Sequence, residues 1–294
     1  MKKRGASFYI RIFIIFLLTL AGIAVFSYPY VASYLSDLHS TRLIETYNKE
    51  AGKLDPSLVA SELKRAHIYN DNLAGDPVHD PFVPGSGAVR GKDYASILNI
   101  AGDGMMGYVV VPKIKVNLPI FHGTSDAVLF RGAGHIEGTS LPVGGKRTHA
   151  VIAGHTGLSS ARLFTDLTSL KVGDMFFIHV LDKTFAYKIN QIKIVLPENT
   201  QDLRLVPGHD YVTLLTCTPY GINSHRLLVR GTRVPYHPAE EKAAAKSTGL
   251  TYEQRLALTA GSITASVMLV LIIIVNRIQR SRAKRAQRAQ ATNK

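Results

Sequence analysis

A single cysteine, Cys217, is the only thiol in the 294 residues of this chain. It follows the apolar run Tyr211–Thr216, and Arg226 lies in the next strand-like run, His225–Arg230. An exported chain either pairs its cysteines or avoids them, so one unpaired thiol beside a strand indicates a nucleophile rather than a disulfide partner. If the reaction is acyl transfer, Arg226 could stabilise the oxyanion by charge-assisted hydrogen bonds. The alternative is an arginine that faces solvent from a strand.

A thiol attacks as its thiolate, and a partner imidazole acts as an acid only when it is protonated. Among the eleven histidines, His155 is the candidate partner, because the segment Val151–Gly157 places it where a buried strand runs into a glycine-flanked turn. Such a turn presents a side chain at the rim of a cleft while its backbone stays anchored in the core. A structural histidine is the other interpretation. His-x-x-x-His and Cys-x-x-Cys patterns are absent from the sequence, so a transition-metal site is unsupported.

Seven short β-branched and apolar runs, separated by turns that contain Gly and Pro, predict a β-barrel or a β-sandwich. The predicted strands are Tyr108–Ile114, Leu118–Phe121, Thr148–Ala153, Met175–Val180, Thr184–Val195, Tyr211–Thr216 and His225–Val234. One helix is predicted among them, capped by Ser160. Its apolar face would consist of Leu163, Phe164, Leu167 and Leu170.

Residues 35–103 form an N-terminal helical region in this interpretation. Asp55 before Pro56 is a good helix start, and Val59, Leu63 and Ala66 follow at helical spacing. Residues 75–91 are rich in Pro and Gly and predict a long loop. A loop of this length in a compact domain is often a lid or a binding loop, and sometimes it is disordered.

Two apolar runs, residues 10–34 and 256–275, can each cross a hydrocarbon core of about 30 Å as a helix. The first could instead be a signal peptide, but its length and the lack of a clear small-x-small site favour a retained anchor. Eleven basic residues and no acidic ones flank the two runs, which leaves a net charge of +3 from the total of +14. This pattern places residues 1–9 and the basic tail 276–294 in the cytoplasm.

The positive-inside pattern explains the high pI without nucleic acid, although a basic tail that binds RNA or anionic lipid is an alternative. The predicted location is the cell membrane, with residues 104–237 as an extracellular catalytic domain and residues 238–255 as a tether to the second membrane helix.

The segment Thr213–Tyr220, followed by Arg226, resembles the Leu-x-Thr-Cys...Arg signature of sortases, and Ala153-Gly154-His155 resembles their histidine motif. The resemblance covers roughly residues 104–235. It implies a mainly β fold, the sortase eight-stranded barrel. It also implies that Cys217 is the nucleophile, His155 the general acid/base, and Arg226 the group that stabilises the oxyanion or the substrate.

Upstream of the barrel, Asp80-Pro81-Phe82 resembles the lid motif of the pilus-assembling class C sortases. The C-terminal membrane run also matches that class. The resemblance implies that Asp80 lies against Arg226 and that Phe82 covers Cys217. An ordinary turn is the alternative, because Asp before Pro is frequent in loops.

The implied reaction is transpeptidation. The enzyme would cleave a Leu-Pro-x-Thr-Gly-like sorting signal between Thr and Gly and join the acyl group to a Lys amine of a pilin subunit, without a metal or an organic cofactor. The expected partners are pilins and the membrane of a Gram-positive cell, and not nucleic acid. Three alternatives remain: a class A-like sortase that attaches surface proteins to peptidoglycan, a hydrolytic cysteine peptidase, and a non-catalytic, doubly anchored scaffold or adhesin. The sequence predicts no oligomeric state.

Overall fold

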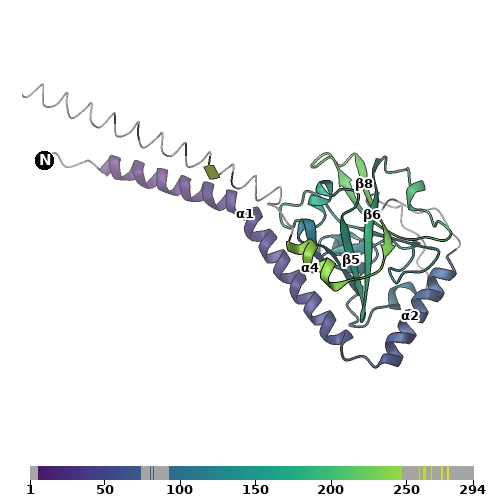
Figure 1. Cartoon of the computed structure of the whole chain (residues 1–294). Coiled ribbons are helices and arrows are strands. Elements are labelled where there is room, and N and C mark those ends of the chain that lie inside the picture. Colours follow the sequence, from purple (N-terminus) through teal and green to yellow (C-terminus); the bar gives the residue numbers. More distant parts are fainter. Residues whose placement is uncertain are drawn as a thin grey trace, which may run out of the picture. The chain divides into compact units, whose positions relative to one another are not determined.

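Eight strands close into one barrel in this computed structural model, which describes residues 6–73, 80, 82, 93–246, 258, 261, 262, 266, 273 and 277. The order around the barrel is β1-β2-β3-β4-β7-β8-β6-β5. The strands are β1 Met105–Val111, β2 Val116–His122, β3 Ala133–His135, β4 Thr148–Ala153, β5 Met175–Val180, β6 Lys183–Val195, β7 Asp210–Thr218 and β8 His225–Val234. Strands β5, β6 and β8 lie next to one another (Figure 1). The predicted mainly β barrel is confirmed.

Two of the strand pairs are parallel, and they determine which loops meet. Strand β2 pairs in parallel with β3, and β4 pairs in parallel with β7, from Thr148 opposite Asp210 to Ala153 opposite Leu215. The chain therefore leaves β4 and β7 at the same end of the barrel. Strand β8 runs antiparallel to β7, so its first residues return to that same end.

The strands carry apolar side chains on both faces. One set comes from all eight strands and fills the barrel; it includes Val109, Ile120, Ala133, Ile152, Ile178, Tyr187, Leu214 and Val229. A smaller cluster consists of Leu129, Ile136, Val151, Ala153, Leu203, Leu215 and Leu228. Successive residues of a strand point to opposite faces, so this second cluster lies on the outer face of β4, β7 and β8. A barrel wall that is apolar outside must be covered there by other segments.

Helix α1 (Ala6–Ala51) is one continuous helix, so it crosses the boundary predicted at residues 34 and 35. Its C-terminal part packs on β1 and β2, where Tyr47 and Ile44 contact Met105 and Phe121. Helix α2 (Pro56–Asp71) begins where predicted. Its N-cap Asp55 accepts a 2.8 Å hydrogen bond from the Ser57 amide.

In the part of the chain that the structure describes, one segment, Leu17–Ala51, is long and apolar enough to cross a membrane, and it is compatible with the predicted anchor. Most of the predicted membrane helix 256–275, the tail 276–294, the first five residues and the loop 75–91 apart from residues 80 and 82 lie outside the described residues. Residues Gly249–Lys294 form a separate unit. The predicted topology of the termini stays a prediction.

The helix predicted from Ser160 is wrong in its start and type. The structure has a short 3₁₀ helix, η3 (Thr165–Ser169), whose N-cap Phe164 makes no side-chain capping bond. Leu163 has a positive φ of 41°, a conformation that an α-helix cannot contain. The apolar side chains predicted for its face are nevertheless buried, with Phe164 at 0% exposure. Their burial against the barrel, rather than helical periodicity, explains the pattern.

Four further short helices and a last α-helix complete the described part of the fold. They are η1 (Tyr94–Ser96), η2 (Pro112–Ile114), α3 (Asp126–Leu129), η4 (Gln201–Leu203) and α4 (Pro238–Lys246). Helix α4 occupies the first part of the predicted tether and contacts β5 and η2. Its Glu241 accepts hydrogen bonds from Tyr236 at 2.7 Å and from His179 at 3.3 Å. The strand β3 was not predicted, because three residues are too few to show alternation.

Tyr47 supplies a testable link between α1 and the barrel. Its buried hydroxyl donates to the Met106 carbonyl at 3.0 Å and accepts from the Leu181 amide at 2.9 Å. Tyr47→Phe leaves both groups without this partner, so we expect the free energy of unfolding to fall by about 1–3 kcal/mol. Urea unfolding of the full chain in detergent measures this loss. The exposed Tyr220 is the control, and a loss as large in Tyr220→Phe would contradict the assignment.

Candidate active site

Cys217 and Arg226 face each other across two neighbouring strands. They are register partners in the antiparallel pair of β7 and β8, near the ends of both strands. Each lies two residues from a member of the outer apolar cluster, Leu215 or Leu228, and so points to the same outer face. Cys217 is 8% exposed and Arg226 is 6% exposed. A thiol and a guanidinium are therefore held side by side, away from bulk water.

The turn that carries His155 is attached to β7 beside the thiol. The Gly154 amide donates to the Leu215 carbonyl at 3.0 Å, and the Thr216 hydroxyl donates to the Gly154 carbonyl at 2.7 Å. Position 154 requires glycine, because an added Cβ would lie 2.7 Å from the Phe164 ring. These contacts place the half-buried His155 at the end of the barrel where Cys217 lies.

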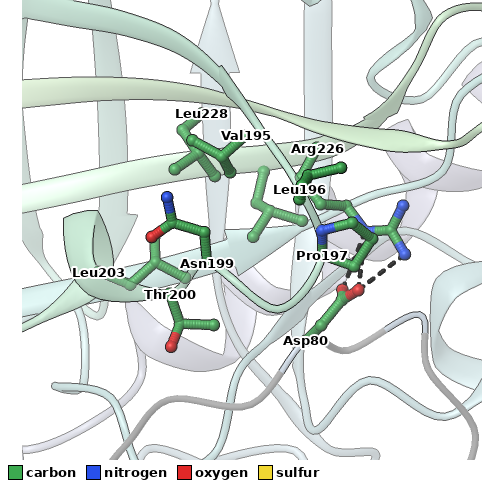
Figure 2. Close-up of a pocket in the computed structure, with 10 residues that line it drawn as sticks. Asp80, Val195, Leu196, Pro197, Asn199, Thr200, Leu203, Arg226 and Leu228 are labelled. Atoms are coloured by element: carbon green, nitrogen blue, oxygen red, sulfur yellow. Dashed lines mark hydrogen bonds and ion pairs between the residues drawn. The ribbon is translucent and has the colours of Figure 1, made fainter.

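Asp80 forms a buried ion pair with Arg226, and the two side chains are 7% and 6% exposed. The Arg226 Nε lies 2.9 and 3.0 Å from the two carboxylate oxygens, and Nη2 lies 2.7 Å from Oδ2 (Figure 2). The third nitrogen, Nη1, donates to the carbonyls of Asn223 and His225. The guanidinium is thus turned toward the carboxylate and the β7–β8 loop.

Phe82 lies against His155 and Arg226. Its ring centroid is 5.5 Å from that of His155 and 5.2 Å from Cζ of Arg226. The Phe82 amide donates to Asp80 Oδ1 at 3.2 Å, so Asp80 and Phe82 belong to the same turn. The structure therefore brings together all five residues predicted for the site.

Burial keeps the thiol and the imidazole uncharged in this arrangement. Burial raises the pKa of Cys217, the Arg226 charge lowers it, and the Asp80 charge raises it again. Burial lowers the pKa of His155, against a smaller opposing effect of Asp126. A thiol with a raised pKa and an imidazole with a lowered pKa are both mostly uncharged at pH 7.

A small cleft adjoins the ion pair under the β6–β7 loop (Figure 2). Its lining is mostly apolar and consists of Asp80, Val195, Leu196, Pro197, Asn199, Thr200, Leu203, Leu215, Arg226 and Leu228. The lining residues from Leu196 to Leu203 belong to the β6–β7 loop. Arg226, the register partner of Cys217, is part of the lining of the cleft.

Sequence reasoning missed Phe130, which caps α3. Its ring centroid lies 5.3 Å from that of His155. No motif or spacing in the chain connects residues 130 and 155, so only the folded barrel could reveal the contact.

Known proteins match this chain over the same region. The family model for the sortase domain matches residues 109–234. Sortase A of Streptococcus agalactiae is 33% identical over 117 residues, which are 39% of this chain and 47% of that protein, so the match spans about half of that relative.

Solved structures match over a longer stretch. Sortase C-1 from Streptococcus pneumoniae is 49% identical, covers 67% of this chain and 100% of its own, and has a TM-score of 0.63. The pilus-related sortase C of Group B Streptococcus is 47% identical, covers 64% and 95%, and has a TM-score of 0.60. Sortase C-1 from Actinomyces oris is 49% identical, covers 62% and 100%, and has a TM-score of 0.58. With this barrel, these motifs and these relatives, the chain belongs to the sortase family of cysteine transpeptidases.

Proposed function

We propose that this protein is a pilus-assembling sortase that cleaves a Leu-Pro-x-Thr-Gly-like sorting signal between Thr and Gly. It then joins the acyl group to a lysine amine of a pilin subunit. The observation that carries the proposal is the cover of the site, in which Asp80 pairs with Arg226 while Phe82 lies against His155 and Arg226. The similarity to sortase C structures, one of them titled as pilus-related, supports the same assignment.

The first half of the proposed reaction forms a thioester. The Cys217 thiolate attacks the threonine carbonyl carbon, and the Arg226 guanidinium stabilises the oxyanion that develops. The bond between Thr and Gly then breaks, and protonated His155 gives its proton to the departing glycine nitrogen. The product is an acyl group bound to sulfur, with a neutral imidazole beside it.

The second half transfers the acyl group to the acceptor. The neutral amine of a pilin lysine attacks the thioester carbon, and His155 takes up the proton that the amine loses. The carbon–sulfur bond breaks, the thiolate returns, and an isopeptide bond remains. The mostly apolar cleft beside Arg226 is the proposed place where the Leu and Pro side chains of the sorting signal approach the site, because Arg226 lines it and is the register partner of Cys217.

Asp80 and Phe82 act as a lid in this proposal. While Asp80 holds Nε and Nη2 of Arg226, those donors cannot reach an oxyanion. Removing the lid exposes the thiol and frees the guanidinium in one movement. Helix α1 would anchor the enzyme in the membrane with the barrel on its outer side.

One other function has an observation in its favour. The curated relatives with detectable similarity include sortase A proteins, which makes attachment of surface proteins to peptidoglycan the second candidate. The two functions differ in the acceptor amine. The lid residues favour the pilin acceptor.

The sortase reaction is tested by intact mass analysis of the Asp80→Ala/Phe82→Ala protein with a Leu-Pro-x-Thr-Gly peptide. We expect a mass gain equal to the peptide cleaved after Thr, mapped to Cys217 and removed by an added amine. Adding a pilin lysine peptide or a peptidoglycan amine separates the two candidate acceptors. If several sorting-motif variants give neither an adduct nor cleavage, the sortase assignment of this chain fails.

The charge of Arg226 alone should not be sufficient. Arg226→Lys keeps the positive charge but loses the planar pair of donors, so we expect a fall in thioester formation of about 100-fold or more. The initial rate of adduct formation measures this, with Cys217→Ala as the blank. Arg230 lies on the same strand and stacks on Tyr211 away from the thiol, so Arg230→Lys is the matched control. Normal adduct formation in Arg226→Lys would remove Arg226 from the proposed mechanism.

The lid should control the ionisation of the thiol. Asp80→Ala/Phe82→Ala removes a negative charge and part of the burial, both of which raise the Cys217 pKa, so we expect this pKa to fall. At pH 7 each unit of the fall increases the thiolate population, and the alkylation rate, about tenfold. The pH profile of iodoacetamide modification measures the shift. Replacing Arg226 by Gln should move the profile to higher pH, and identical profiles in all three proteins would contradict gating.

A further inference from the structure

Phe130 is an exposed aromatic side chain held on a rigid support. It follows Leu129, which is 1% exposed and packs in the outer apolar cluster with Val151, Ala153 and Leu215 under the site. Phe130 itself is 56% exposed, and its amide donates to the Asp126 carbonyl at 2.9 Å. Because its backbone is tied to α3 and its neighbour is buried, the ring has a fixed base.

Two aromatic rings contact the His155 imidazole. Phe82 lies at 5.5 Å with an interplanar angle of 42°, and Phe130 lies at 5.3 Å with an angle of 48°. Phe82 belongs to the lid and departs with Asp80 when the site opens. Phe130 belongs to the barrel and stays, so it is the aromatic contact of His155 that persists in the open site.

The orientation of the imidazole is not fixed by a hydrogen bond to any residue that the structure describes. Among the described residues, no side chain or carbonyl bonds to either ring nitrogen, and the buried Nε2 is unpaired. In a triad, a carboxylate bonded to the second nitrogen holds the histidine in position. Packing against a ring is the remaining way to restrict the rotation of this side chain.

Charged groups lie near the His155 imidazole, but none of them orients it as the packing against Phe130 does. Asp126 of α3 faces His155 through space, and its exposure to solvent screens its charge. Cys217, Arg226 and Asp80 are the other titratable or charged members of the site. None of these four has a hydrogen bond to the imidazole in the described structure.

We propose that Phe130 is a positioning residue that holds the His155 imidazole in the open site, in the place that a hydrogen-bonded carboxylate takes in a triad. The inference rests on the proposed function for the role of His155. The contact itself stands on the geometry of α3 and the His155 turn.

The test uses the full chain in detergent with the lid opened by Asp80→Ala/Phe82→Ala, and adds Phe130→Ala or Phe130→Tyr. Histidine NMR signals, assigned with His155→Gln, report the imidazole pKa and its mobility. Loss of the ring exposes the imidazole, so we expect Phe130→Ala to raise the His155 pKa and to broaden or average its signals. Phe130→Tyr keeps the ring and should restore both values. Tyr220→Ala removes an exposed aromatic that adjoins Gly157 rather than the imidazole, and should leave the His155 pKa unchanged.

Peptide cleavage by the same proteins separates positioning from substrate binding. We expect kcat to fall about tenfold in Phe130→Ala with KM unchanged, because misplacing a general acid affects the chemical step. An unchanged His155 pKa and kcat would overturn the proposal, and so would a rise in KM alone, which would make Phe130 a substrate contact.

Two further observations keep the test decisive. Thermal unfolding of each variant shows whether α3 is intact, and Phe130→Tyr supplies a folded comparison if Phe130→Ala is not. The NMR titration needs no turnover. Absence of cleavage with Phe130 intact would therefore count against the proposed function, while the titration alone would still decide the role of Phe130.

Discussion

The buried ion pair between Asp80 and Arg226 is the interaction on which the arrangement of this site depends. A guanidinium that is 6% exposed is tolerated only because a carboxylate and two carbonyls satisfy its donors. Removing the carboxylate alone would leave a buried cation without a partner. Under the proposed mechanism, the oxyanion of the reaction takes the place of the Asp80 carboxylate beside Arg226. The guanidinium therefore keeps an anionic partner throughout.

The same burial affects the ionisation of the thiol and the imidazole. Desolvation favours the neutral thiol and the neutral imidazole, while the reaction requires the thiolate and the imidazolium. The Arg226 charge would favour the thiolate, but Asp80 opposes it while the lid is closed. Under the proposed mechanism, opening the lid would lower the Cys217 pKa and raise the His155 pKa, so both changes would favour the reactive forms. One loop would then regulate access, oxyanion stabilisation and ionisation together.

The strand order of the barrel brings the residues of the site together. The parallel pairing of β4 with β7 brings the His155 turn to the thiol, and the antiparallel pairing of β7 with β8 brings Arg226 opposite Cys217. The outer apolar cluster beneath them needs a cover, and the β6–β7 loop, α3 and Phe82 supply it. The chemistry thus lies on the outer wall of the barrel, where covering segments can move without disturbing the core.

The amino-acid sequence by itself determined seven of the eight strands of the barrel, the start of α2 at Asp55 and Pro56, and the five candidate residues of the site. Alternating apolar runs, a helix cap and short motifs are local patterns, so they can be recognised without the fold. Sequence patterns failed where burial mimicked periodicity, as in the helix predicted from Ser160, and where the element was too short to show a pattern, as in β3. The resemblance implied that Asp80 lies against Arg226, and the structure shows this ion pair. Only the tertiary structure decided that α1 is bound to the barrel through Tyr47 and that Phe130 contacts His155. These contacts join residues far apart in the chain, and their partners are selected by strand register and packing, which no local pattern specifies.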